Sequence, residues 1–154
     1  MTEPATLGAC CDTSGCACVF AKALLARSAE CALARRRAVA ERVLVECSSP
    51  VAHTNCSLLA ALMHERARFA LRLPPPGRPV IHMQALRLQC GGLAALQQSL
   101  QTPARDVHGL VGLAHERHGS LMDLPWDELV PSLAAWKPRH RSRPTTQAAQ
   151  ANDE

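Results

Sequence analysis

The segment that decides most about this chain is residues 47–56, which read Cys-Ser-Ser-Pro-Val-Ala-His-Thr-Asn-Cys. Its Ser49–Pro50 pair predicts the start of a helix, because serine is a good N-cap and proline fits the first helical position. Cys47, His53 and Cys56 therefore surround a helix N-terminus, where backbone N–H groups favour the negative charge of a thiolate. We interpret this segment as part of a thiol-rich metal site.

A third cysteine, Cys90, stands directly before Gly91 and Gly92 in a later segment that also predicts a helix. Each glycine inside a helix costs about 1 kcal/mol relative to alanine, so we expect either a closely crossing helix or a ligand beside the backbone. Cys47, Cys56 and Cys90 fall on the apolar stripes of their predicted helices. Three thiols are therefore expected to face one core.

The candidate ligand set extends beyond these three cysteines, because zinc sites and iron–sulfur clusters usually take four protein ligands. Cys31 precedes Cys47 on the same predicted helix and points about 160° away from it, so His53 is the preferred fourth ligand. The N-terminal segment adds further candidate ligands for a soft metal, namely Cys10, Cys11, Cys16 and Cys18. The alternative is that the cysteines pack as small hydrophobic residues, and their spacing matches no standard ligand pattern.

Length and composition favour a single helical domain. The chain has 154 residues, of which 47% are hydrophobic but only 3% aromatic. A core of Ala, Leu and Val favours packed helices over a sheet sandwich. We predict an all-α, single-domain bundle of about five helices, spanning residues 19–46, 50–73, 80–101, 104–118 and the stretch from Asp123 to 136. Residues 1–18 are expected to be a flexible Cys-rich arm, 19–136 the helical domain, and 137–154 a basic disordered tail.

Several classes of function are disfavoured by the same sequence. The formal net charge of +4 is small for a nucleic-acid-binding domain. No apolar run is long enough to span a membrane, and the N-terminus does not resemble a signal peptide. We therefore expect a cytoplasmic protein whose cysteines are not in disulfides. No catalytic triad or acid–base pair is visible, so no enzymatic reaction is predicted.

Together these patterns predict a small cytoplasmic metal- or iron–sulfur-binding protein that serves electron transfer, redox sensing or cofactor assembly. The expected cofactor is an iron–sulfur cluster or zinc. The alternative is a non-enzymatic helical adaptor that binds a partner protein and uses its cysteines as structural core residues. The sequence leaves the metal, the partner and the oligomeric state open.

Overall fold

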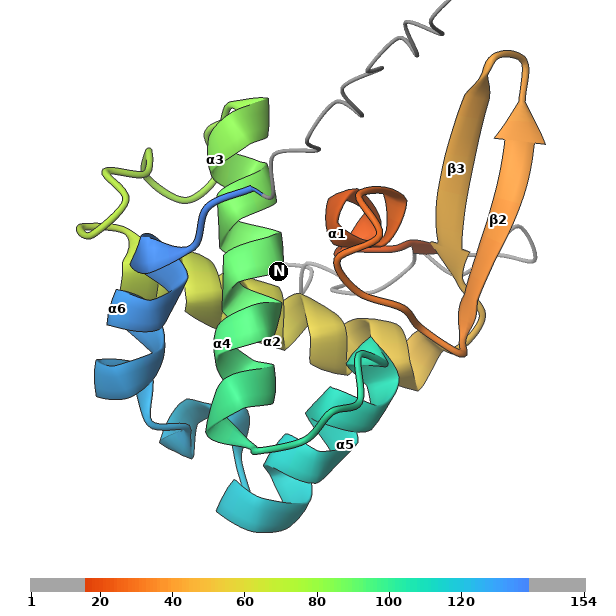
Figure 1. Cartoon of the computed structure of the whole chain (residues 1–154). Coiled ribbons are helices and arrows are strands. Elements are labelled where there is room, and N and C mark those ends of the chain that lie inside the picture. Colours follow the sequence, from red (N-terminus) through yellow and green to blue (C-terminus); the bar gives the residue numbers. More distant parts are fainter. Residues whose placement is uncertain (1–15, 139–154) are drawn as a thin grey trace, which may run out of the picture.

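The chain folds into a mixed α/β structure in which a small antiparallel sheet lies beside a group of packed helices (Figure 1). This computed structural model describes residues 16–138. The sheet has three strands in the order β1-β3-β2, all antiparallel. The prediction of an all-α helical bundle is therefore wrong.

The error lies in residues 19–46, which were predicted to form one long helix. They form the short helix α1 (Ala21–Leu25) and then the strands β2 (Ala34–Val39) and β3 (Arg42–Cys47). Val43 and Val45 are β-branched and lie two residues apart, a spacing that suits a strand. Pairing with β2 and burial of Val45 outweigh the helix propensity of the many Ala, Leu and Arg residues.

Strands β2 and β3 form a hairpin that projects from the body of the molecule (Figure 1). Their register runs from Ala34 opposite Cys47 to Val39 opposite Arg42, which leaves Ala40 and Glu41 as a two-residue turn. The third strand, β1 (Cys16–Ala17), pairs with the other edge of β3 near its end. Only the base of the hairpin therefore belongs to the three-stranded part of the sheet.

Helix α2 (Pro50–Ala67) begins where the sequence predicts. The Ser49 hydroxyl accepts a hydrogen bond from the Ala52 N–H at 3.3 Å, and Pro50 occupies the first turn. The helix ends at Ala67, earlier than predicted, and a proline-rich loop leads to the next helix. The buried face of α2 consists of Ala52, Leu59, Leu62, Met63 and Ala67.

The second half of the described chain is helical. Helix α3 (His82–Leu86), the π-helical turn η1 (Arg87–Gly91) and helix α4 (Gly92–Ser99) form one continuous stretch. Helix α5 (Val107–His118) follows its N-cap Asp106, whose side chain accepts a hydrogen bond from the Gly109 N–H, and does not begin at residue 104 as predicted. The 3₁₀ turn η2 (Leu121–Asp123) then precedes helix α6 (Trp126–Ala135).

A close helix crossing accounts for the glycine pair. A methyl group at Gly91 would lie 2.9 Å from both the Leu133 carbonyl oxygen and the Trp136 Cβ atom. At Gly92 it would lie 2.5 Å from the Met63 sulfur. Helices α2 and α6 therefore approach this part of the chain so closely that a larger residue would collide with them.

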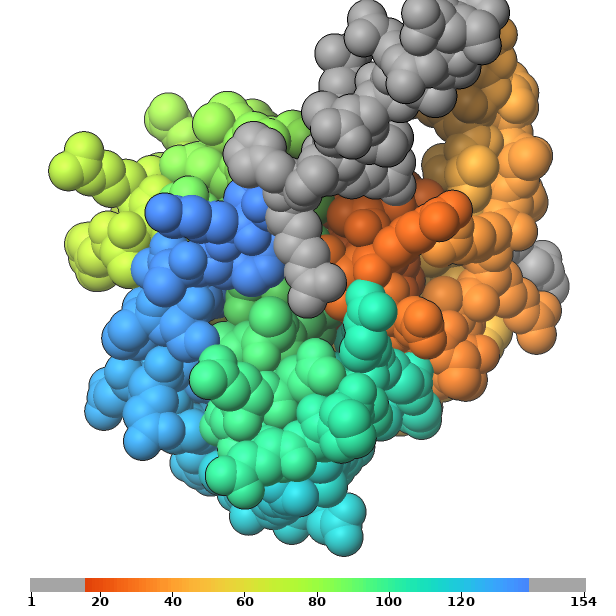
Figure 2. All heavy atoms as spheres, viewed as in Figure 1, coloured from red at the N-terminus to blue at the C-terminus, as the bar shows by residue number. Residues whose placement is uncertain are grey.

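One continuous hydrophobic core joins the helices to the base of the sheet. It runs from Val45 and Phe20 through Leu59 and Leu96 to Leu133. Leu59 and Leu96 are completely buried, whereas the hairpin beyond Val45 forms the right-hand edge of the molecule in the space-filling view (Figure 2). Within residues 16–138, no helix combines the length and the apolar character needed to cross a membrane.

Candidate thiol site

Four cysteines from four different segments line one small cavity. Cys18 directly follows β1, Cys31 lies in the loop before β2, Cys47 ends β3, and Cys56 lies in the second turn of α2. The remaining wall is made by two histidines and four apolar residues, namely His53, His108, Val19, Ala34, Ala52 and Val107. The cavity therefore lies where the end of the sheet meets the N-termini of α2 and α5.

The hairpin brings Cys31 and Cys47 to the same end of the sheet. Because the chain reverses at Ala40 and Glu41, Ala34 lies opposite Cys47. The Cys31 carbonyl accepts a hydrogen bond from the Ala34 N–H at 3.2 Å, which fixes the turn that carries Cys31. On the other side of β3, the Cys18 N–H donates to the Val45 carbonyl at 2.9 Å. The backbone therefore holds three of the four cysteines at one place.

The loop that carries Cys31 is also tied to the N-terminus of α5. The Val107 N–H donates to the Glu30 carbonyl at 2.8 Å. The Ala32 N–H donates to the Asp106 Oδ1 atom at 2.9 Å, while the other carboxylate oxygen caps α5. Asp106 therefore positions one wall of the cavity without contributing a ligand-type atom to its lining.

Two thiols of the cavity, Cys56 and Cys18, have raised pKa values. Burial raises the pKa of the Cys56 thiol to about 12, and the neighbouring Cys18, Cys31 and Cys47 thiols add to that rise. Burial likewise raises the pKa of Cys18, with Cys31 and Cys47 contributing in the same direction. Each thiolate disfavours a second one nearby, because like charges repel. A bound cation would remove this repulsion, since metal binding displaces the thiol protons.

The cavity is small. Its volume is about 20 Å³, and a cavity needs roughly 10–15 Å³ to hold one water molecule. The space therefore suits one atom or ion rather than a larger group. Apart from the thiols and the two imidazoles, the described residues of its wall are apolar, and none of them carries a carboxylate.

The structure does not contain a preformed metal site of the kind predicted. Among residues 16–138, no three His, Cys, Asp or Glu side chains are arranged so that they could hold a metal ion. The expectation of a ready-made metal-binding group is therefore contradicted for this part of the chain. Binding of a metal at the cavity would therefore require the thiols around it to move closer together than they are in this structure.

The structure brings together some of the predicted ligands. Cys47, Cys56, His53 and Cys18 share the cavity, and one ring nitrogen of His53 lies 3.0 Å from the Ala17 carbonyl oxygen. Cys16 lies opposite Cys47 in the sheet and is disulfide-bonded, so the expectation that no cysteine forms a disulfide is wrong there. Cys10 and Cys11 lie outside the described residues.

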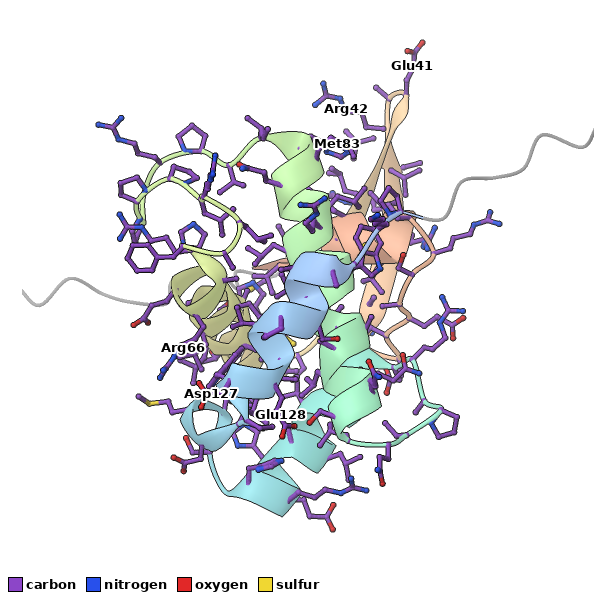
Figure 3. The ribbon with its side chains drawn as sticks, turned by 60° about the vertical axis from the view of Figure 1, so that its left-hand side comes forward. Glu41, Arg42, Arg66, Met83, Asp127 and Glu128 are labelled. Atoms are coloured by element: carbon purple, nitrogen blue, oxygen red, sulfur yellow. The ribbon has the colours of Figure 1, made fainter. Side chains whose placement is uncertain are left out.

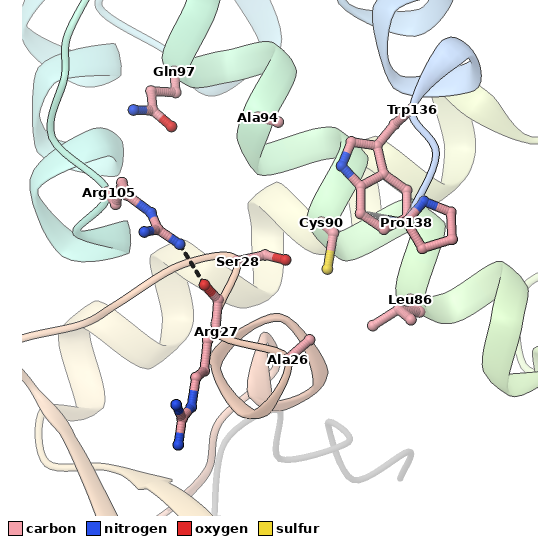
Figure 4. Close-up of a pocket in the computed structure, with 10 residues that line it drawn as sticks. All are labelled: Ala26, Arg27, Ser28, Leu86, Cys90, Ala94, Gln97, Arg105, Trp136 and Pro138. Carbon is pink, nitrogen blue, oxygen red and sulfur yellow. Dashed lines mark hydrogen bonds between the residues drawn. The ribbon is translucent and has the colours of Figure 1, made fainter. Parts of the chain in front are cut away.

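Cys90 lies in a different pocket. It belongs to η1 and is only 2% exposed, and burial raises the pKa of its thiol, while a hydrogen bond with Ser28 lowers it. Figure 4 shows it between Ser28 and Trp136, which also line this pocket. None of the four thiols that line the thiol cavity lines this pocket.

Sequence reasoning missed Cys31 as a member of the cavity. The argument against it assumed a straight helix from Cys31 to Cys47, which the hairpin replaces. The signal that pointed the other way was the Val43-Leu44-Val45 run, because β-branched residues at alternate positions favour a strand.

Fold and site together define a small α/β protein with a cysteine-lined cavity at the junction of sheet and helices. Comparisons of the chain with protein-family models, with curated proteins and with solved structures find no match.

Proposed function

We propose that this protein binds a soft metal through Cys18, Cys31, Cys47 and Cys56. The observation that supports the proposal is that these four thiols, from four separate segments, line one cavity. Thiolates are the ligands that zinc and iron–sulfur centres prefer, and four of them satisfy either one. A packing role alone does not require four cysteines from distant segments to meet.

The small cavity favours a single ion, Zn²⁺, over an iron–sulfur cluster. Four deprotonated cysteines can surround zinc tetrahedrally at about 2.3 Å. A cluster also takes four thiolates, but it needs more room, so β3 and α2 would have to separate. A cluster would support electron transfer, redox sensing or cofactor assembly, whereas zinc would hold the four segments together.

The wider setting of the proposal is a reducing compartment. Five of the six described cysteines are free thiols, whereas Cys16 is disulfide-bonded. A majority of free thiols is typical of compartments in which glutathione and thioredoxin keep cysteines reduced. A cytoplasmic location is part of this proposal for that reason.

The second candidate function, an adaptor for a partner protein, is favoured by Val39, Val43 and Leu44, three apolar side chains that the hairpin exposes.

The experiment compares Cys31→Ser with Cys90→Ser. The protein is purified without oxygen, its visible absorption is recorded, and its zinc and iron are counted per chain. We expect about one zinc per chain in the wild-type protein and loss of that zinc in Cys31→Ser. Cys90→Ser is the matched control, because it also removes a free thiol but lies outside the cavity, and it should keep the zinc.

Two results decide against zinc or against the site. The wild-type protein could instead contain iron and sulfide and absorb visible light, with both signals lost in Cys31→Ser. That result would show that the bound group is an iron–sulfur cluster at the same residues and not zinc. A wild-type protein that contains no metal and takes up none from added Zn²⁺ would leave the cysteines as core residues. Equal metal content in Cys31→Ser and Cys90→Ser would also remove this site from consideration.

A further inference from the structure

Strand β2 is an open edge of the sheet. In the order β1-β3-β2 it has β3 on one side, and no other strand among the described residues lies on its outer side. Its six residues pair with β3 without a bulge, and it contains no proline. Natural edge strands commonly carry a bulge or a proline, because an open row of N–H and C=O groups invites pairing with another chain. Strand β2 has neither of these two features.

The register shows which backbone groups point outward. The Ser48 N–H donates to the Leu33 carbonyl at 3.0 Å, one step beyond the Ala34–Cys47 pair. Because hydrogen-bonded and non-hydrogen-bonded pairs alternate along an antiparallel ladder, Arg36 and Ala38 belong to the second kind. Their N–H and C=O groups therefore point away from β3. The bond from Cys18 to the outward carbonyl of Val45, which is opposite Arg36, agrees with this alternation.

The side chains of the hairpin are mainly basic. Residues 34–47 contain four arginines and two glutamates. Arg37 forms a 2.7 Å ion pair with Glu46, and the Arg36 guanidinium donates to the Leu24 carbonyl. Arg35 is exposed and makes no ion pair with any other described residue. Arg35 and Arg37 share one face of β2, because side chains alternate along a strand.

The turn and its neighbours add apolar surface at the far end. Val39, Val43 and Leu44 are each at least 40% exposed. Glu41 and Arg42 lie at the tip of the hairpin (Figure 3). The far end of the hairpin therefore offers a partner both apolar side chains and an open edge.

We propose that β2 binds an acidic, extended segment of a partner protein as an additional antiparallel strand. The backbone of Arg36 and Ala38 supplies the hydrogen bonds, as in other β-strand additions. Carboxylates at alternate positions of the partner lie beside Arg35 and Arg37. A second copy of this chain fits less well, because β2 against β2 brings arginines together and like charges on adjacent strands destabilise pairing.

The probe is a short acetylated and amidated peptide that alternates Glu and Thr. We expect it to bind the full chain, measured by NMR titration, and to protect the Arg36 and Ala38 amides from hydrogen exchange. The same peptide with Lys in place of Glu should not bind. A third peptide keeps every Glu but carries N-methyl groups on alternate amides, and it should also fail, because it cannot complete the ladder.

Two pairs of variants test the surface. Ala38→Pro removes an outward N–H without affecting the hydrogen bonds to β3, and proline is tolerated on an open edge. This variant should abolish peptide binding. The control variant Ala38→Val keeps the N–H and should bind the peptide as the wild type does. Arg35→Glu should weaken binding by about tenfold. Arg78→Glu, an equal charge change in the exposed loop before α3, should leave binding unchanged.

Several outcomes would overturn the proposal. Equal binding of the N-methylated peptide would show charge attraction without strand addition. If the alternating Glu peptide does not bind, or if it protects amides elsewhere than in β2, then β2 is not the binding surface. Binding of a DNA or RNA duplex with the same Arg35 dependence, but not of the peptide, would assign the hairpin to nucleic acid. None of these outcomes depends on whether the thiol cavity holds a metal.

Discussion

At the scale of single residues, Gly91 shows how little room the core leaves. A side-chain methyl there would meet the carbonyl oxygen of Leu133 and the Cβ atom of Trp136, each at 2.9 Å. Neither of these atoms is the far end of a flexible side chain, so relief requires a shift of α6. Gly112 in α5 is also a helical glycine, but nothing lies within 4 Å of its equivalent position.

We therefore expect opposite effects from the same substitution at these two glycines. Gly91→Ala should lower the free energy of unfolding by about 1–3 kcal/mol, because overpacking displaces a neighbouring helix. Gly112→Ala should raise it by up to about 1 kcal/mol, since alanine favours a helix and nothing obstructs it. Urea denaturation measures both. A stabilised Gly91→Ala protein would show that α6 does not cross where the structure has it.

The cysteines show at the same scale why composition alone could not define the site. Cys31 and Cys90 are both free cysteines in apolar surroundings, and nothing in their immediate sequence separates them. What separates them is the chain reversal between Cys31 and Cys47. The helix predicted for residues 19–46 placed Cys31 on the side away from Cys47, so His53 was preferred to Cys31 as a ligand, whereas Cys90 was included. The reason for passing over Cys31 does not hold, because strands β2 and β3 replace that helix.

At the scale of elements, the β2–β3 hairpin is the feature that the sequence did not predict. Helix α2 was predictable because its start depends on local chemistry, namely the Ser49 cap and Pro50. The end of α5 at Gly119 and the glycine pair were likewise indicated by local signals, whereas α2 ends at Ala67, before the predicted position. The hairpin depends on cross-strand pairing and on burial of Val45, which are contacts between residues distant in sequence, and its turn lacks the glycine or asparagine that usually marks one.

That turn is strained in a way that a substitution can relieve. Ala40 has φ +54°, a left-handed conformation that costs an L-residue roughly 1–2 kcal/mol. Ala40→Gly should therefore stabilise the hairpin by up to about 1 kcal/mol, since glycine offsets part of that gain with its own backbone entropy. Slower hydrogen exchange of the β2 and β3 amides would measure the gain.

The control for the turn is Ala38→Gly in the middle of β2. Its backbone is extended, so glycine relieves nothing there and should destabilise the hairpin by about 0.5–1 kcal/mol. Equal exchange rates in both variants would contradict the assigned two-residue turn.

At the scale of the whole molecule, the thiol cavity is the point at which the end of the sheet meets the N-termini of α2 and α5. Strand β3 contributes Cys47, the segment directly after β1 contributes Cys18, the loop after α1 contributes Cys31, and α2 contributes Cys56. A metal bound to all four would cross-link these segments. Its binding energy would add to the stability of the fold, because the unfolded chain does not hold the four thiols together.

The most direct test of this claim is a titration of the reduced, metal-free protein with Co²⁺, followed by visible absorption. Cobalt replaces zinc in tetrahedral thiolate sites and reports both thiolate ligation and geometry, which zinc cannot do. We predict thiolate-to-cobalt charge-transfer bands and tetrahedral d–d bands that saturate at about one Co²⁺ per chain. They should be weakened in Cys31→Ser and unchanged in Cys90→Ser. The absence of thiolate bands in the wild-type protein, or their loss in Cys90→Ser with retention in Cys31→Ser, would contradict the account.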